Sequence, residues 1–329
     1  PVVQALEKAV QNGKQVTVLM EVKARFDEAN NILMARRLEK AGAHVIYGLV
    51  GLKTHSKCTL VIRREKDGIR RYVHVATGNY NASTAKLYTD LGILTCSDRF
   101  GIDASAFFNL LSGYSDPPIW DSFIVAPINL RQRCIELIDR EIHFAKNGED
   151  AHMIAKMNSL LDKGIIEKLY EASQAGVKIE LIVRGICVLI PGIPGVSDNI
   201  TVRSIVGRFL EHSRIFWFRN GGREELYISS ADWMPRNLND RVELMVPIED
   251  PEIKRRLKQM VDIELSDNQK AHIMQADGTW LKTISAENQL CAQEYFQKIA
   301  EKRDAEDEMT LAQKLEPYTP VLGHGDGSD

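Results

Sequence analysis

The chain has 329 residues, of which 44% are hydrophobic and 26% charged, and its formal net charge is −3 at pH 7. That length and composition are typical of a globular protein of about two domains, and the weakly acidic balance argues against a global basic field that would bind nucleic acid or an anionic membrane. No apolar run approaches the roughly 20 residues of a membrane span, and five scattered cysteines without metal-binding spacing predict reduced thiols in the cytoplasm.

The first predicted unit is an amphipathic helix, a glycine stop and a buried strand within residues 2–21. Gly13 stands where the end of a helix favours a residue that tolerates positive φ. Arg25 follows the strand and is expected at its C-terminal end, where ligands of α/β proteins gather.

The stretch GLKTHSK at residues 51–57 comes next, directly ahead of an apolar run. His55 and Lys57 are two positions apart, so on a strand their side chains would share one face. A polar turn and another strand follow, within residues 71–81. An imidazole and an ammonium aimed at one spot make this stretch the first candidate site.

The second half repeats this order. After a bridging helix at 130–148 come a strand at 151–158 and another helix–glycine–strand unit, which ends at Arg184. The stretch FLEHSRIFWF then places His212 and Arg214 two positions apart. The chain continues with a predicted helix at 250–267, a hairpin around Asp277–Gly278 and a helix at 285–308.

A tandem duplication explains the order of these elements. Gly13 and Gly176 are 163 positions apart, and His55 and His212 are 157 apart, so the two offsets differ by six, which loop lengths absorb. We therefore expect an α/β fold of two domains related by a pseudo-twofold axis. The expected boundaries are 1–125 and 126–305, followed by a mostly disordered tail at 306–329.

One strand breaks the duplication. The counterpart of the strand at 151–158 would lie ahead of Pro1, which predicts that the chain is a piece lacking the first strand of its first domain.

Two histidines with neighbouring cations suit phosphoryl transfer. A neutral imidazole is a good nucleophile near pH 7, a second one can act as general acid, and Lys57 and Arg214 would neutralise phosphate oxygens. Either motif alone is more often a structural histidine. Both together, in register with a repeat, favour function. The arginines at residues 25 and 184, at corresponding strand ends, indicate a phosphate clamp.

The motifs LKTHSK, ARFDE, TGNYN, RFLEHSRIFWFRNGG and LYISSADWMPRN resemble the carboxy-terminal half of the bacterial polyphosphate kinase family. The likeness runs from residue 1 to about residue 300. It implies two phospholipase D-like domains and reversible transfer of the terminal phosphate of ATP to inorganic polyphosphate. It also implies Mg²⁺, ATP or ADP as substrate, a homo-oligomer in the full-length protein, and a cytoplasmic location that could be peripheral at the inner membrane face.

The resemblance also assigns roles to residues. It implies that His55 becomes a phosphohistidine, that His212 acts as acid or base and contacts the nucleotide phosphates, and that Tyr88 and Arg184 contact ATP. Arg25 falls at a position associated with the magnesium site. A guanidinium has no acceptor for a cation, so we expect it to hold a phosphate that magnesium also neutralises.

Two alternatives stay open. The first is a phospholipase D-like phosphodiesterase or nuclease; against it, the aspartate of that pattern is replaced by Ile62 after the first motif and by Arg219 after the second. The second is a polyphosphate- or nucleotide-binding module without chemistry. Full-length polyphosphate kinases carry amino-terminal domains that help to bind the nucleotide, so this chain alone is hypothesised to be inactive.

Overall fold

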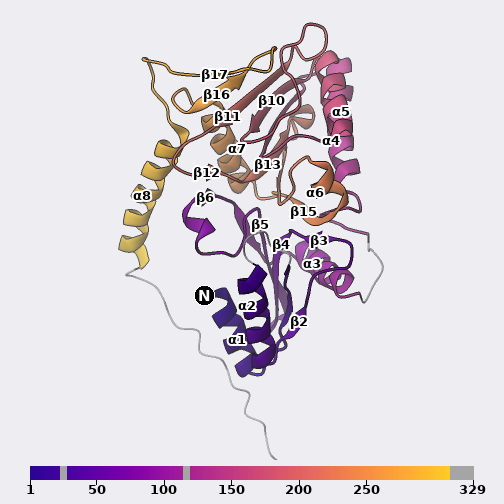
Figure 1. The fold of residues 1–329 in the computed structure, drawn as a ribbon, viewed down its shortest axis with the longest axis vertical. Helices are drawn as coiled ribbons and strands as arrows, with labels where there is room; N and C mark the ends of the chain where they lie inside the picture. The colour runs from indigo at the N-terminus through magenta and orange to yellow at the C-terminus, as the bar shows by residue number, and fades with distance from the viewer. Residues whose placement is uncertain (23–27, 114–118, 312–329) are drawn as a thin grey trace, which may run out of the picture.

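The computed structural model describes residues 1–22, 28–113 and 119–311, with side chains to residue 303 (Figure 1). Its central feature is a ten-stranded mixed sheet in the order β17-β16-β11-β10-β9-β13-β14-β15-β3, with β8 also paired to β15. The strands are β3 (Lys53–Thr54), β8 (Ile124–Ala126), β9 (His152–Met157), β10 (Lys178–Val183), β11 (Ile200–Ile205), β13 (Arg214–Phe218), β14 (Glu225–Ser229), β15 (Arg241–Pro247), β16 (Ala271–Met274) and β17 (Trp280–Lys282).

The first half builds smaller sheets. One has three strands in the order β4-β5-β7, one pairs β1 with β2, and one pairs β6 with β12. Its first two helices carry little buried surface, since α1 contains no buried residue and α2 contains two, whereas α3 contains six. The elements of this half are α1 (Val2–Gln11), β1 (Thr17–Leu19), α2 (Glu28–Ala41), β2 (His44–Ile46), β4 (Lys57–Glu65), β5 (Gly68–Ala76), η1 (Thr84–Lys86), β6 (Tyr88–Thr89), β7 (Gly92–Thr95) and α3 (Asp98–Leu111). The partner of β6, β12 (Leu210–Glu211), comes from the second half.

The large sheet is buried on both faces, so its central strands are apolar without alternation. Met153 and Ala155 of β9 pack against α4 and α5, whereas Ile154 between them packs on the side of α3 and α7. Burial of each large side chain contributes about 1.5–3 kcal/mol. The remaining helices are α4 (Leu130–Lys146), α5 (Lys163–Gln174), η2 (Asn220–Gly222), α6 (Pro235–Asn239), α7 (Pro251–Leu265) and α8 (Ala292–Leu311).

Most predicted elements are confirmed. The helices expected at 130–148 and 250–267 are α4 and α7, and the hairpin around Asp277–Gly278 joins β16 to β17. The last helix begins at Ala292 instead of 285 and continues to Leu311; the predicted tail beyond that lies outside the described residues. Among the described helices, none is both long enough and apolar enough to cross a membrane.

Two short parallel pairings join the halves. In β3–β15, Thr54 of the first half lies opposite Val242 of the second. In β6–β12, Thr89 of the first half lies opposite Glu211 of the second. Each half therefore inserts a strand beside the other half, and the two candidate motifs lie at these crossings.

Candidate active site

Each candidate histidine stands in a two-residue gap between strands. His55 follows β3, and Lys57 begins β4. His212 follows β12, and Arg214 begins β13. The sequence predicted that each pair would share one continuous strand. Instead, the regular hydrogen bonding of the strand is interrupted at each histidine. The imidazole therefore need not follow the alternation of side chains between the two faces of a sheet.

The backbone around the two histidines is held in the same way. The N–H groups of His55 and of the serine that follows it both donate to the carbonyl of Val242, at 2.9 Å each. The N–H groups of His212 and its following serine both donate to the carbonyl of Thr89, at 3.2 and 2.9 Å. Both acceptors belong to the opposite half, so the pseudo-twofold relation extends to individual hydrogen bonds.

The residue after each of these carbonyls is a carboxylate that binds the imidazole. Nδ1 of His55 lies 2.9 Å from both oxygens of Glu243. Nδ1 of His212 lies 2.8 Å from Oδ1 of Asp90. Each histidine is thus oriented by a carboxylate from the other half, and neither half alone holds an oriented imidazole.

Burial keeps both histidines neutral at pH 7. It lowers the pKa of His55 to about 4, against the opposing effect of Glu243, and it lowers the pKa of His212 below its ordinary value. Burial acts to raise the pKa of both carboxyls, but their histidine partners hold the pKa of Glu243 and of Asp90 below normal. A carboxylate only accepts, so each Nδ1 carries the proton and each Nε2 keeps its lone pair. The lone pair of His212 faces Nη1 of Arg214, which lies 3.1 Å from Nε2.

The two cations of the motifs lie beside these rings. The Lys57 ammonium donates to the carbonyl of His55, and Nη1 of Arg214 donates to the carbonyl of His212 at 2.7 Å. Arg214 is buried with Asp232, to which its Nε donates at 3.1 Å. Burial lowers the pKa of Lys57 to about 7. The charge of Lys57 also lowers the pKa of both histidines, so the four side chains form one electrostatic cluster.

The two orienting carboxylates are supported differently. Glu243 is fully buried and also accepts from the hydroxyl of Ser230 and the amide of Asn237, each at 2.5 Å. Asp90 is partly exposed and accepts from the hydroxyl of Thr77 at 2.7 Å. A Cβ on Gly78 would lie 2.1 Å from Oδ2 of Asp90, so a glycine is required for this approach.

The predicted nucleotide contacts lie on the His212 side. The ring of Tyr88 is 5.0 Å from that of His212, centroid to centroid. Nε of Arg184 donates to Asn158 at 2.9 Å, and the amide of Asn158 donates to the carbonyl of His212 at 3.3 Å. Arg184 therefore reaches the histidine through one side chain. Arg25 lies outside the described residues.

A buried polar network supports the strand that precedes His212. Glu211 accepts from Lys156 at 2.7 Å and from Thr89 at 2.9 Å. Gln293, at the start of α8, donates to Glu211 at 2.7 Å, and its amide oxygen accepts from the N–H of Phe209 at 3.0 Å. Burial raises the pKa of Glu264, a further acceptor of Lys156, to about 7. This network joins the start of α8 to the β6–β12 crossing.

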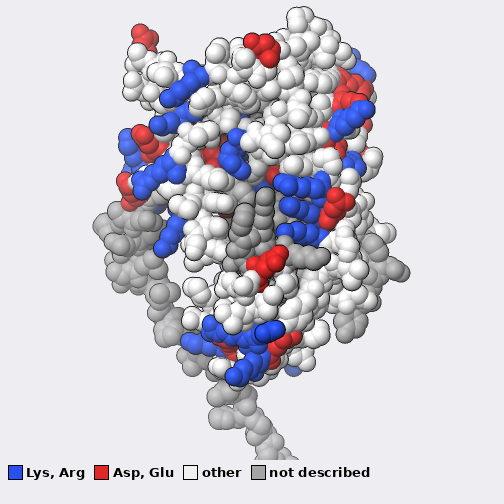
Figure 2. Space-filling model, viewed as in Figure 1, with Lys and Arg blue, Asp and Glu red and all other residues white. Residues whose placement is uncertain are grey.

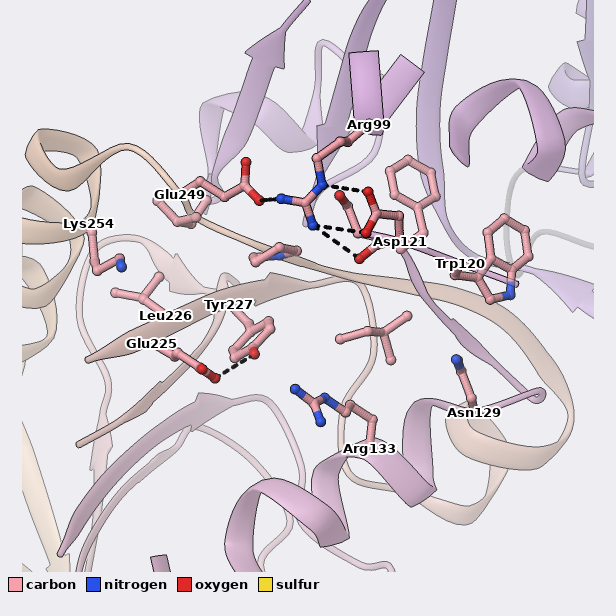
Figure 3. Close-up of a pocket in the computed structure, with 15 residues that line it drawn as sticks. Arg99, Trp120, Asp121, Asn129, Arg133, Glu225, Leu226, Tyr227, Glu249 and Lys254 are labelled. Atoms are coloured by element: carbon pink, nitrogen blue, oxygen red, sulfur yellow. Dashed lines mark hydrogen bonds and ion pairs between the residues drawn. The ribbon is translucent and has the colours of Figure 1, made fainter. Parts of the chain in front are cut away.

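One cavity lies away from these residues (Figure 3). It has a volume of about 430 Å³, and Arg99, Asp121 and Glu249 form an ion-pair chain along its wall. None of the candidate residues lines it. A smaller cavity of about 250 Å³ is lined by Tyr88, Asp90 and the Glu211 network, and so opens beside the His212 motif.

The described residues do not build a metal cage. Among them, no group of three or more His, Cys, Asp or Glu side chains is placed to hold a metal ion. Glu243, Asp90 and Asp232 are each occupied by hydrogen-bond donors. Magnesium is commonly bound by one or two carboxylates together with substrate phosphates, and that mode of binding does not require such a cage.

Sequence reasoning missed both orienting carboxylates, since each lies far along the chain from its histidine: 188 positions for Glu243 and 122 for Asp90. One signal was present. Asp90 follows His55 by 35 residues and Glu243 follows His212 by 31, so each carboxylate recurs at a similar place in the repeat.

Known proteins match along the chain. A family model described as polyphosphate kinase C-terminal domain 1 matches residues 1–117, and one described as polyphosphate kinase C-terminal domain 2 matches residues 123–293. The polyphosphate kinase of Halalkalibacterium halodurans is 60% identical over 271 residues, which are 82% of this chain and 38% of that protein. The chain thus spans about two-fifths of the length of the curated relatives it matches.

Solved structures match as well. The crystal structure of polyphosphate kinase from Porphyromonas gingivalis has a TM-score of 0.85 at 38% identity, covering 93% of this chain and 47% of that one. A phosphatidylserine synthase from Haemophilus influenzae has a TM-score of 0.53 at 10% identity, covering 94% and 84%, and shares the fold alone. The predicted fold class and the resemblance stated from the motifs are both confirmed.

Proposed function

The chain belongs to the polyphosphate kinase family, and on that premise we propose that it carries the centre for reversible transfer of the terminal phosphate of ATP to inorganic polyphosphate. The observation that carries the proposal is the pair of oriented, neutral imidazoles, each with a buried lysine or arginine beside it. Phosphoryl transfer requires mainly positioning and charge stabilisation, which this arrangement supplies.

The first half-reaction uses His55 as nucleophile. Its Nε2 lone pair attacks the γ-phosphorus, the bond from that phosphorus to the bridging oxygen breaks, and ADP leaves with the electron pair. Glu243 stabilises the cationic phosphohistidine through the Nδ1 proton. Lys57 and Arg214 neutralise the non-bridging oxygens.

His212 handles the proton. Bound phosphate anions raise the pKa of a neighbouring imidazole, so its Nε2 can carry a proton to the bridging oxygen, with Asp90 holding the imidazolium. In the second half-reaction, a terminal oxygen of polyphosphate attacks the phosphohistidine, and the nitrogen–phosphorus bond breaks. Free His55 is restored and the polymer is longer by one phosphate.

Partners are proposed on the same basis. Tyr88, Arg184 and His212 would contact ATP, and Arg25 would hold a phosphate that Mg²⁺ also neutralises; the ion would arrive with the nucleotide. We also propose that the protein forms a homo-oligomer. Its proposed location is the cytoplasm, with a peripheral position at the inner membrane face as the alternative. Light scattering and cell fractionation test these two points.

Incubation with γ-labelled ATP and magnesium tests the central proposal. We expect acid-labile, base-stable label on the chain, because both histidines and their orienting carboxylates lie within it; such label would contradict the hypothesis that the chain alone is inactive. The label should be absent from His55→Ala and retained in His143→Ala, which changes an exposed histidine of α4. Absence of label on a folded chain that still binds polyphosphate would favour the binding module. Cleavage of a generic phosphodiester without nucleotide would favour the phosphodiesterase.

A further inference from the structure

Two arginines beside the β3–β15 crossing have no assigned part in the chemistry: Arg241 lies opposite Lys53 across it, and the charge of Arg236 acts on Arg241. Arg241 opens β15 two residues before Glu243, so the two side chains lie on the same face of the strand. Arg236 lies on α6, which leads directly into β15. Both are therefore carried by the segment that orients the nucleophile.

These arginines are unpaired. Within the residues that the structure describes, neither guanidinium has a hydrogen-bond or ion-pair partner. Elsewhere a half-buried arginine is matched: Arg140 makes two 3.0 Å contacts with the carboxylate of Glu225. Arg241 is half-buried and still has no such match.

Their neighbours add to the positive charge. Burial lowers the pKa of Arg241, and the charges of Arg236 and Arg214 lower it further, while Glu243 and Asp232 act in the opposite direction. Folding thus brings three guanidinium groups close enough to repel one another, although two of the three have no carboxylate bound. Such a cluster is destabilising until an anion occupies it, which is the usual condition of a phosphate site.

The cluster lies on one side of the histidine pair. In Figure 1, α6, β15 and β3 are to the right of β13, whereas β6 and β12, with Tyr88 beside His212, are to its left. Figure 2 shows lysine and arginine side chains gathered over the region of α6 and the start of β15 in the same view. The centre therefore has two flanks, and the predicted nucleotide contact Tyr88 lies on the other flank.

We propose that Arg236 and Arg241 form a phosphate subsite that holds the polyphosphate chain while its end reacts at His55. This rests on the proposed function and extends it by separating the two substrates. The planar fork of a guanidinium pairs with two phosphate oxygens at once, and two neighbouring arginines suit successive phosphates of a linear chain. The triphosphate of the nucleotide has the same chemistry, so the test must separate the two.

The variants are Arg236→Gln, Arg241→Gln and the double change, with Arg223→Gln as control. Arg223 is an exposed arginine between η2 and β14 that has no ion pair among the described residues. The first measurement is the affinity for end-labelled polyphosphate, by fluorescence anisotropy. We expect a loss of about tenfold for each arginine and little change in the control.

The second measurement uses label on His55. We expect the variants to be labelled by ATP as the unchanged chain is, and ADP to discharge that label at the same rate. Discharge by polyphosphate should be about tenfold slower for each arginine removed. Circular dichroism checks folding, and Arg241→Lys, which keeps the charge, replaces Arg241→Gln if the latter unfolds.

The outcomes separate the two proposals. Equal slowing of discharge by ADP and by polyphosphate would assign the arginines to the nucleotide and overturn the inference. Unchanged binding of polyphosphate in the double variant would also overturn it. If the unchanged chain takes no label but its binding of polyphosphate still depends on both arginines, the proposed transfer fails while the subsite stands.

Discussion

The two halves of the molecule present the same motif on very different supports. The second half places His212 against a ten-stranded sheet whose strands β9 and β13 are buried on both faces. The first half places His55 between β3, a two-residue strand at the edge of that sheet, and β4 of a three-stranded sheet. The local hydrogen bonds nevertheless match one by one. The repeat has kept the backbone that aims an imidazole, while the surrounding packing has diverged.

The two orienting carboxylates reverse this contrast. His55, on the weaker support, is held by Glu243, which is fully buried and has three donors. His212, on the stronger support, is held by the partly exposed Asp90. Each half supplies the other with its carboxylate, so His55, the proposed nucleophile, is oriented by the well-packed half. His212, proposed to handle the proton, has the more exposed carboxylate as its partner.

The largest loss of activity is expected from a change of Glu243, the fully buried carboxylate that binds His55. We expect Glu243→Gln to slow phosphohistidine formation by about 10³-fold, because an amide can hold the imidazole in the wrong tautomer. The measurement is the rate of acid-quenched label transfer from ATP. Glu180→Gln is the matched control, since Glu180 accepts from His152 at 2.7 Å away from the site. Equal losses in both variants would contradict a specific role.

A smaller loss of activity is expected from a change of Asp90, the partly exposed carboxylate that binds His212. Asp90→Asn should slow transfer by about 10²-fold, within the range of general acid–base contributions. Gly78→Ala should act in the same direction, because its Cβ would displace the carboxylate of Asp90. If Asp90→Asn costs more than Glu243→Gln in the same assay, the order of the two sides is wrong.

The pH dependence of label transfer tests whether the charge of Lys57 is required. Burial lowers the pKa of Lys57 to about 7, so the ammonium that holds phosphate is lost as pH rises through 7. The label-transfer rate at low ATP should fall about tenfold between pH 6 and 8. His55, with a pKa of about 4, stays neutral down to pH 5 and adds no acid limb there. Lys57→Arg should remove the alkaline fall, and a fall that persists in this variant would exclude Lys57 as its cause.

The smallest loss of activity is expected from a change of Gln293, which bonds to Glu211 from α8. Gln293→Ala removes hydrogen bonds to Phe209 and Glu211 and should lower turnover about fivefold by loosening the strand before His212. Gln297→Ala, one turn further along α8, is the control. A steady-state comparison of kcat and KM for ATP distinguishes the two. An equal effect of both changes would mean that α8 only stabilises the fold.

The sequence predicted what repeats locally. Each helix, glycine and strand unit could be read from periodicity and Gly13 or Gly176, and both histidine motifs could be read from spacing. The joining of β3 to β15 could not be read, because no local pattern specifies a partner so distant in the chain. The breaks in the ladder at His55 and His212 were missed for the same reason, since the opposite half holds them.

Because His55 is oriented by a carboxylate from the other half, its site cannot form until that half has been synthesised. Glu243 leaves the ribosome 188 residues after His55, which at ordinary rates of synthesis is a delay of about 10–40 s. During that interval the imidazole of His55 lacks the carboxylate that orients it in the folded chain. The oriented arrangement of His55 is therefore complete only once β15 has been synthesised and has paired with β3.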